Sequence, residues 1–312
     1  MPESFAPIPA ARKLARAFFV LAFLTWILIA FGALVRAKQA GLACPDWPLC
    51  HGDALPDLRL KGVVYEFGHR ALAGVVALFY AFLAWRVLRY PELRFRMRKH
   101  MIGGAILLLV QILFGGLTVL IVHRGSGAPR PEAWTVVTHL ILGNSFAALV
   151  LLAGLRLQRW SLALPERPVQ PLPIARVWHR TWLALLVAQF ILGGSVAANI
   201  AGLICTDFPQ CFPGVWFPSW QGYMALQLLH RLTAYALLLA AFGQAWALRG
   251  TGRAGQVAAG LAALVVVQAV LGAVNIYSYL HTAVTTSHSA VAALLFSGTA
   301  VLAWLLHRRR NA

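Results

Sequence analysis

The chain has 312 residues, of which 60% are hydrophobic and only 12% are charged, and its mean hydropathy is +0.72. Soluble globular proteins carry about 25% charged residues, so this composition excludes a soluble domain and predicts an integral membrane protein. The net charge of +18 would suit a nucleic-acid-binding protein, unless the basic residues gather on one side of a membrane.

Several apolar segments are long enough to cross a bilayer core, which needs roughly 20 residues of helix. The eight segments are 16–36, 62–87, 100–122, 132–156, 177–202, 220–248, 255–277 and 282–306. The first follows Arg12, Lys13 and Arg16 as a signal peptide would, but its apolar run is too long and no clear cleavage site follows. We therefore predict an all-α, polytopic membrane protein with eight transmembrane helices.

The basic residues gather on the side of the membrane where the chain begins. Of the 27 Lys and Arg residues, 19 fall on that side, and Arg70 and Arg231 lie within predicted spans. The six on the opposite side are Arg36, Lys38, Arg59, Lys61, Arg124 and Arg130. Cytoplasmic loops are rich in Lys and Arg, so we expect both termini in the cytoplasm and no nucleic-acid partner. The basic inner surface would also attract anionic membrane lipid or an acidic electron-transfer partner.

The loop after the first segment contains Cys44 and Cys50, and a later outward loop contains Cys205 and Cys211. An even number of cysteines, paired within loops on the oxidising side of a membrane, predicts the disulfides Cys44–Cys50 and Cys205–Cys211. A purely structural role and a redox role are both open. Cys50 and His51 do not form a c-type haem motif, which requires two residues between its cysteines.

Segment 62–87 enters from the outside and carries Glu66, His69 and Arg70 near its start. We expect the basic stretch RYPELRFRMRKH that follows to be a short inner loop, ending at an interfacial His100. Segment 100–122 contains Gln111, and the outward stretch HRGSGAPRPE after it is expected to be flexible, with a solvated His123. Segment 132–156 then places His139 in its second turn.

The second half of the chain repeats the first. A shift of 161 residues carries Cys44, Cys50, His69 and Arg70 onto Cys205, Cys211, His230 and Arg231, and His288 answers His139 at a shift of 149. Each half starts inside, so the sequence predicts two duplicated four-helix bundles in parallel orientation. The corresponding division is 1–160, a proline-rich cytoplasmic linker 161–176, and 177–312.

One position breaks the match between the halves. Glu66 stands three residues before His69, on the same helical face, whereas its counterpart is the neutral Gln227. A carboxylate within a membrane pocket is a functional residue by default. Alternatively, Glu66 only forms hydrogen bonds with a loop or with an arginine such as Arg70.

Four of the ten histidines lie at similar depths on alternate predicted helices: His69, His139, His230 and His288. An uncompensated ionisable group in lipid costs about 2.5 kcal/mol or more, so something must bind them. Zinc would need more ligands than a histidine pair provides, and a proton relay would need partner carboxylates in both halves. Haem between two imidazoles of a helical bundle fits best. Arg70 and Arg231 would then pair with haem propionates, or else extend to the lipid headgroups.

At these residues the chain resembles the haem A synthase family. The resemblance covers nearly the whole chain and rests on EFGHR at 66–70, His139, LLHR at 228–231, TSH at 286–288, and the loops GLACPDWPLC and GLICTDFPQC. No single motif is decisive, but the ordered set of one Glu, four His and two Cys pairs is specific.

The resemblance implies a bacterial plasma (inner) membrane enzyme, an oxidoreductase that converts the ring methyl of haem O to the formyl group of haem A. Successive hydroxylations and loss of water would achieve this, for terminal oxidase cofactor biosynthesis. His69, His139 and Arg70 of the N-terminal half would bind the substrate haem O, with Glu66 as the catalytic carboxylate. His230 and His288 would ligate the iron of a haem b near Arg231. Haem O synthase and an electron-transfer protein are candidate partners, and the sites would face the outer side.

Two other functions compete with this interpretation. A di-haem transmembrane electron-transfer cytochrome b would use both histidine pairs, but it has no need for a carboxylate in one half only. A transporter is suggested by the duplicated halves, but repeated helix-breaking segments at the bilayer midplane are not evident.

Overall fold

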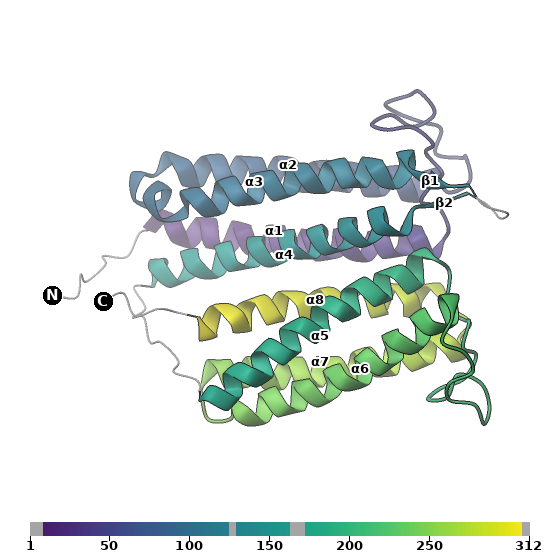
Figure 1. Ribbon diagram of the computed structural model, residues 1–312. Helices are drawn as coiled ribbons and strands as arrows, with labels where there is room; N and C mark the ends of the chain where they lie inside the picture. The colour runs from purple at the N-terminus through teal and green to yellow at the C-terminus, as the bar shows by residue number, and fades with distance from the viewer. Residues whose placement is uncertain (1–8, 125–128, 163–171, 308–312) are drawn as a thin grey trace.

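The computed structural model describes residues 9–124, 129–162 and 172–307, and within these ranges eight helices are long and apolar enough to cross a membrane (Figure 1). Their bounds are α1 Pro9–Ala37, α2 Val63–Arg89, α3 Pro91–Leu120, α4 Ala133–Ser161, α5 Pro173–Ala198, α6 Gly222–Ala247, α7 Arg253–Tyr277 and α8 Thr282–Leu306. The strands β1 (Val122–His123) and β2 (Arg130–Pro131) form a two-residue antiparallel hairpin that the sequence did not predict. The predicted all-α, polytopic membrane fold is confirmed.

The helices pack around two separate apolar cores. In the first group, α1 and α3 each pack against both α2 and α4, and their core includes Phe18, Tyr80 and Met97. In the second group, α5, α6, α7 and α8 pack in sequence order around a core that includes Trp182 and Leu302. Figure 1 shows these groups one above the other. Each core is built from four consecutive helices.

The two groups meet along a seam formed by α1, α4, α5 and α8. The packed pairs across it are α1 with α8, α4 with α5, and α4 with α8. A polar contact fixes the seam within the apolar region, because the indole Nε1 of Trp26 in α1 donates to Ser297 Oγ in α8 at 3.0 Å. Side chains of one group are therefore close to helices of the other.

The prediction of an inner loop at 89–100 is wrong. Only Tyr90 separates α2 from α3, which begins at Pro91, a position where the missing N–H of proline costs no helical hydrogen bond. Leu93 and Met97 are one turn apart and fully buried in the first core. Although the residues between them are mostly basic, Leu93 and Met97 form an apolar stripe on one face of the helix. This stripe packs on the first core, so α3 continues inward beyond the predicted membrane span.

The other bounds differ from the predicted ones by smaller amounts. The first helix begins at Pro9 rather than at 16, because Ala11, Leu14 and Phe18 continue the buried stripe. The remaining differences are five residues or fewer, and α8 matches the predicted 282–306.

His123 in the outward loop is exposed, and its Nδ1 lies 3.2 Å from a carboxylate oxygen of Glu132. Residues 125–128 of the outward loop, and most of the expected linker 161–176, lie outside the described residues.

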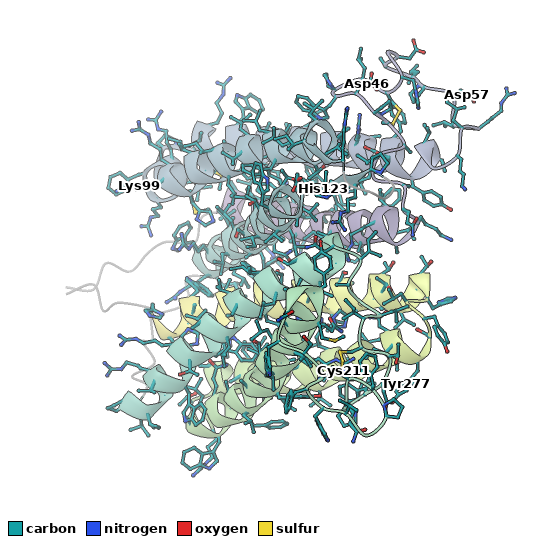
Figure 2. The ribbon with its side chains drawn as sticks, turned by 45° about the vertical axis from the view of Figure 1, so that its right-hand side comes forward. Asp46, Asp57, Lys99, His123, Cys211 and Tyr277 are labelled. Carbon is teal, nitrogen blue, oxygen red and sulfur yellow. A yellow bond between two sulfur atoms is a disulfide. The ribbon has the colours of Figure 1, made fainter. Side chains whose placement is uncertain are left out.

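All the cysteine-containing loops lie at one end of the bundle. Figure 2 shows Asp46, Asp57, Cys211 and Tyr277 at this end and Lys99 at the other. The start of α1 and the end of α8 also lie at the Lys99 end (Figure 1). The even-numbered helices therefore begin beneath the loops, which places the first turns of α2, α4, α6 and α8 at a common depth.

Candidate functional site

The four candidate histidines lie near the starts of the even-numbered helices and form two pairs. The rings of His69 and His139 are close enough to interact electrostatically, and so are those of His230 and His288. No group of three or more His, Cys, Asp or Glu side chains that could bind a metal ion occurs in the described part of the chain. Each half therefore offers two imidazoles, which is fewer ligands than a closed zinc site uses.

Each histidine ring lies against a glycine of the preceding odd-numbered helix. A Cβ added at any of these glycines would come within 3.4 Å or less of the ring. The four pairs are Gly32 with His69, Gly115 with His139, Gly193 with His230, and Gly272 with His288. The missing side chains leave room for the imidazoles at one depth in all four places, so every helix contributes to a pocket.

The surroundings of the ring nitrogens differ between the two pairs. Nδ1 of His139 lies 3.2 Å from the Gln111 carbonyl oxygen, and Nε2 lies 3.3 Å from the Gln111 amide nitrogen. A proton on Nδ1 satisfies both contacts and leaves the Nε2 lone pair free to bind iron once the amide moves away. Nδ1 of His230 and Nδ1 of His288 are buried and have no hydrogen-bond partner among the described residues.

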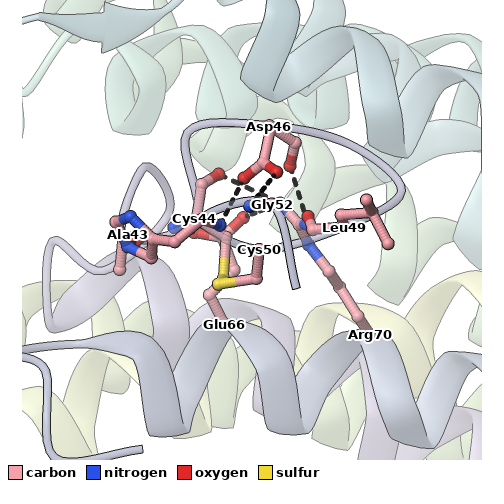
Figure 3. Close-up of a disulfide and its surroundings, with 9 residues drawn as sticks. Ala43, Cys44, Asp46, Leu49, Cys50, Gly52, Glu66 and Arg70 are labelled. Atoms are coloured by element: carbon pink, nitrogen blue, oxygen red, sulfur yellow. Dashed lines mark hydrogen bonds and ion pairs between the residues drawn. A yellow bond between two sulfur atoms is a disulfide. The ribbon is translucent and has the colours of Figure 1, made fainter. Parts of the chain in front are cut away.

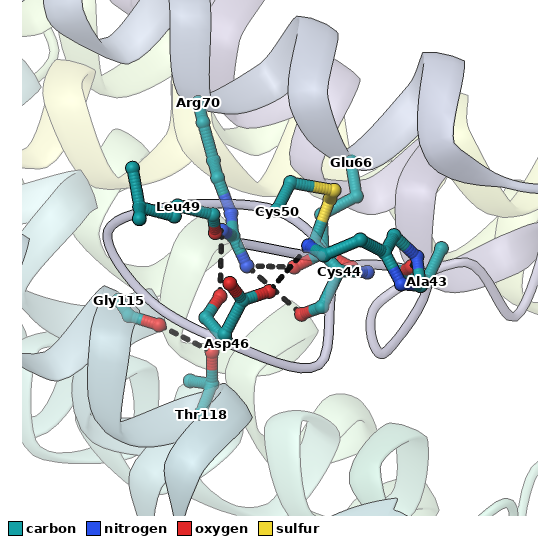
Figure 4. Close-up of polar contacts among 10 residues, drawn as sticks. Ala43, Cys44, Asp46, Leu49, Cys50, Glu66, Arg70, Gly115 and Thr118 are labelled. Carbon is teal, nitrogen blue, oxygen red and sulfur yellow. Dashed lines mark hydrogen bonds and ion pairs between the residues drawn. A yellow bond between two sulfur atoms is a disulfide. The ribbon is translucent and has the colours of Figure 1, made fainter. Parts of the chain in front are cut away.

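Arg70 anchors the first cysteine loop to α2. Its Nη1 donates to the carbonyl oxygens of Asp46 (2.9 Å) and Leu49 (2.7 Å), and its Nη2 donates to that of Cys44 (3.1 Å) and to Glu66 Oε1 (2.7 Å). Figure 4 shows the guanidinium reaching from the helix into the ring of loop carbonyls. All four terminal N–H groups are thereby used, so a propionate would have to use Nε or displace a loop carbonyl.

Arg231 forms the same contacts in the second half. Its Nη1 donates to the carbonyl oxygens of Asp207 (2.8 Å) and Gln210 (2.6 Å), and its Nη2 donates to that of Cys205 (3.2 Å). Each acceptor stands 161 residues after its counterpart in the first loop. The Nε atom of Arg231 is buried without a hydrogen-bond partner in the described structure, so one donor remains available inside the second pocket.

The Glu66 carboxylate joins the first loop to the helix. Oε1 accepts from Arg70, and Oε2 accepts the backbone N–H of Cys44 at 3.2 Å. Gln227 is equally buried, but its Nε2 contacts only the Gly202 carbonyl oxygen, at 3.4 Å, and its Oε1 has no partner among the described residues. Glu66 thus makes the loop and arginine contacts of the alternative that the sequence left open, and these contacts hold its carboxylate one helical turn from His69.

Both predicted disulfides are present. Cys44 is bonded to Cys50, and Cys205 is bonded to Cys211. In the first loop, the backbone N–H groups of Gly52 (2.8 Å) and His51 (2.7 Å) donate to the Asp46 carboxylate (Figure 3). These hydrogen bonds, with that of Gly52 the stronger influence, lower the pKa of Asp46 below its usual value.

The chain is similar to known proteins over most of its length. The family model described as cytochrome oxidase assembly protein (COX15-CtaA) matches residues 15–63 and 59–300. The chain belongs to this family. It is 30% identical to the haem A synthase of Shouchella clausii, over 89% of this chain and 92% of that protein. It is also similar to the haem A synthases of Shewanella oneidensis (28%, 87% and 90%) and Caulobacter vibrioides (27%, 98% and 99%).

The two pockets of this COX15-CtaA family member fit a haem group. Imidazole side chains of a helical bundle are common ligands of haem iron, and a haem also needs space beside those ligands. The chain provides partly buried histidines in pairs, a glycine beside each ring, and, in the second pocket, buried Nδ1 atoms without a hydrogen-bond partner among the described residues. The histidine pairs and the glycines beside the rings occur in both halves, whereas the unpartnered Nδ1 atoms occur in the second pocket.

The sequence did not single out three residues that shape these pockets. Tyr277 donates to Asp207 Oδ1 (3.1 Å) and to the Phe208 carbonyl oxygen (2.7 Å), while Tyr235 donates to that of Pro209 at 3.5 Å. Arg36 lies at the seam, near His288. A comparison of the two repeats could have found them, because each is a polar residue whose counterpart in the other half is apolar or small. The counterparts of Tyr277, Tyr235 and Arg36 are Leu120, Gly74 and Ala197.

Proposed function

We propose that the protein is a haem A synthase, an oxidoreductase that converts the ring methyl of haem O to the formyl group of haem A. The observation that supports this most is the asymmetry between two otherwise equivalent histidine pockets. A buried carboxylate, Glu66, lies beside the first pair, and the neutral Gln227 occupies its place beside the second. Family membership and the names of the similar proteins point to the same reaction.

His69 and His139 of the N-terminal half, 1–160, bind the substrate haem O. His230 and His288 of the C-terminal half, 177–312, ligate a resident haem b. The bound haem b would supply one-electron transfer near the substrate. The unpartnered ring nitrogens of the second pair and the glycines beside all four rings support this assignment.

Glu66 acts on the electron-poor carbon that forms when a methyl group is oxidised. A carboxylate in a site of low dielectric constant strongly stabilises positive charge that develops nearby. The hydrogen bonds from Arg70 and the Cys44 N–H hold this carboxylate in one orientation. The same contacts link it to the outer loop, so the loop positions the catalytic group.

The protein lies in the bacterial plasma membrane with both termini in the cytoplasm. The opposite ends of the bundle support this orientation, because the disulfide-bonded loops share one end and the basic inner extensions of α1 and α3 share the other. Disulfides form in oxidising compartments, and basic residues gather on the cytoplasmic side. Haem O would enter from a haem O synthase, and electrons would leave to a separate carrier.

Expression in a host that makes haem O but no haem A tests the proposal. We expect the extracted pigments to contain haem A or its hydroxylated precursor, together with haem b bound to the purified protein. Haem b alone, at full occupancy, would instead support a di-haem electron-transfer cytochrome b. A protein that stays colourless with ample haem would refute both functions.

A further inference from the structure

Arg36 stands in the last turn of α1, in the first half of the molecule, yet it lies close to a histidine of the second half. The packing of α1 against α8 brings its guanidinium within electrostatic range of the His288 ring. The Trp26–Ser297 hydrogen bond fixes the same pair of helices deeper in the seam. The position of Arg36 is therefore set by helix packing rather than by a loop.

The charge of Arg36 has no protein counterion. No hydrogen bond or ion pair joins its side chain to any residue in ranges 9–124, 129–162 and 172–307, although the side chain is partly buried. A cation at a protein seam within a membrane usually pairs with an acid or binds an anionic ligand. Because no acid among the described residues pairs with it, the guanidinium is available to an anionic ligand.

The arginine at position 36 is not repeated in the second half of the chain. The residue 161 positions after Arg36 is Ala197, near the end of α5, so the second half returns no such cation to the first pocket. Conversely, the first pocket contains Glu66, which neutralises Arg70, whereas Arg231 has no carboxylate bonded to it. The second pocket is thus the more positively charged of the two.

We propose that Arg36 of the N-terminal half binds a carboxylate of the tetrapyrrole that His230 and His288 ligate in the C-terminal half. This inference rests on the resident haem b of the proposed function and assigns it an anchor across the seam. A haem carries two propionates, and a charge-assisted hydrogen bond from a guanidinium is among the stronger contacts available to them. The first pocket lacks this anchor, as suits a substrate that must leave after oxidation.

The test compares Arg36→Gln with Lys38→Gln in the full-length, purified protein loaded with haem b. Both variants lose one positive charge at the outer end of α1, but Lys38 is exposed. Transfer of haem b to excess apomyoglobin should be about 10-fold faster or more for Arg36→Gln, given the strength of hydrogen bonds to charged groups. The midpoint potential of haem b should fall, because a lost cation favours the oxidised iron. Lys38→Gln should match the wild type in both measurements.

A third variant, Arg36→Lys, covers the case in which Arg36→Gln takes up no haem at all. Restored uptake in Arg36→Lys supports an electrostatic anchor, and continued failure contradicts it. The inference is also overturned if Arg36→Gln retains haem b and its potential as Lys38→Gln does. Wild-type protein that anchors haem b through Arg36 but makes no haem A would contradict only the proposed function. Haem A formation with unaltered haem b in Arg36→Gln would contradict only this inference.

Discussion

The pocket of His69 and His139 and the pocket of His230 and His288 have the same frame but different charges. In both, glycines lie beside the rings, and an arginine binds three equivalent loop carbonyls. The first adds a carboxylate that cancels its arginine, and the second replaces that carboxylate with Gln227. The two halves therefore share the residues that surround the histidines and differ in a few polar residues, which the proposed function relates to catalysis in the first pocket and haem retention in the second.

The outer loops differ in the same sense. The hydroxyls of Tyr277 and Tyr235 contact three acceptors in the second loop, and Leu120 and Gly74 stand at the equivalent positions of the first half. Arg70 and Arg231 bind the two loops alike, and Glu66 adds one hydrogen bond to the first loop. A loop with fewer side-chain hydrogen bonds opens at a lower free energy, which suits a pocket that exchanges substrate for product.

Removal of one histidine from either pocket should have the largest effect and should affect the two pockets differently. His230→Ala should abolish the absorbance spectrum of the resident haem b, because the iron loses a ligand. His69→Ala should keep that spectrum and lose conversion of haem O. Spectra of the purified proteins and extracted pigments would measure both. If His69→Ala lost haem b and His230→Ala kept it, the roles of the two halves would be exchanged.

The glycines beside the rings test whether the pockets depend on close packing. In Gly193→Ala the added Cβ would stand 2.9 Å from His230 Cε1, so the ring must move, at a cost of about 1–3 kcal/mol. We expect lower haem b occupancy and an altered spectrum. Gly260→Ala on α7 is the matched control, since no atom lies within 4 Å of its Cβ. Equal haem content in the two variants would show that the ring positions tolerate the change.

Loosening of the second loop should make it resemble the first. Tyr277→Phe removes the hydroxyl whose one proton is shared between Asp207 Oδ1 and the Phe208 carbonyl oxygen, a hydrogen bond worth about 1 kcal/mol. We expect faster amide hydrogen exchange across residues 205–215 and somewhat faster loss of haem b. Tyr279→Phe serves as the control, because that side chain is 83% exposed. Unchanged amide exchange in Tyr277→Phe would show that the Tyr277 hydroxyl does not stabilise the second loop.

The smallest effect concerns pH. The folded loop lowers the pKa of Asp46, so its hydrogen bonds stabilise the loop above the unfolded-state pKa of about 3.9. This stabilisation is lost as the pH falls through the lower, folded-state pKa. Exchange of the His51 and Gly52 amides should therefore rise only under acidic conditions, and Asp46→Asn should show the raised exchange at neutral pH. A rise that began at neutral pH in the wild type would contradict the assignment.

The sequence predicted the parts of this structure that depend on local pattern. Apolar runs indicated the spans, and the repeat indicated the histidine pairs and both disulfides. It missed the inner extension of α3, because the many basic residues there obscured the stripe formed by Leu93 and Met97. The hydrogen bonds of Glu66 could not be predicted, because they depend on how the loop folds back over α2. The seam position of Arg36 likewise depends on packing between halves.

Substitution of Glu66 and Gln227 by each other's residue type tests most directly whether the Glu66 carboxylate is needed for haem A formation. Glu66→Gln and Gln227→Glu would each be expressed in the host that makes haem O but no haem A, and their pigments extracted. We predict that Glu66→Gln keeps haem b but forms haem A about 100-fold or more slowly, with haem O or a hydroxylated intermediate accumulating, while Gln227→Glu continues to make haem A. Normal haem A formation by Glu66→Gln would contradict the account.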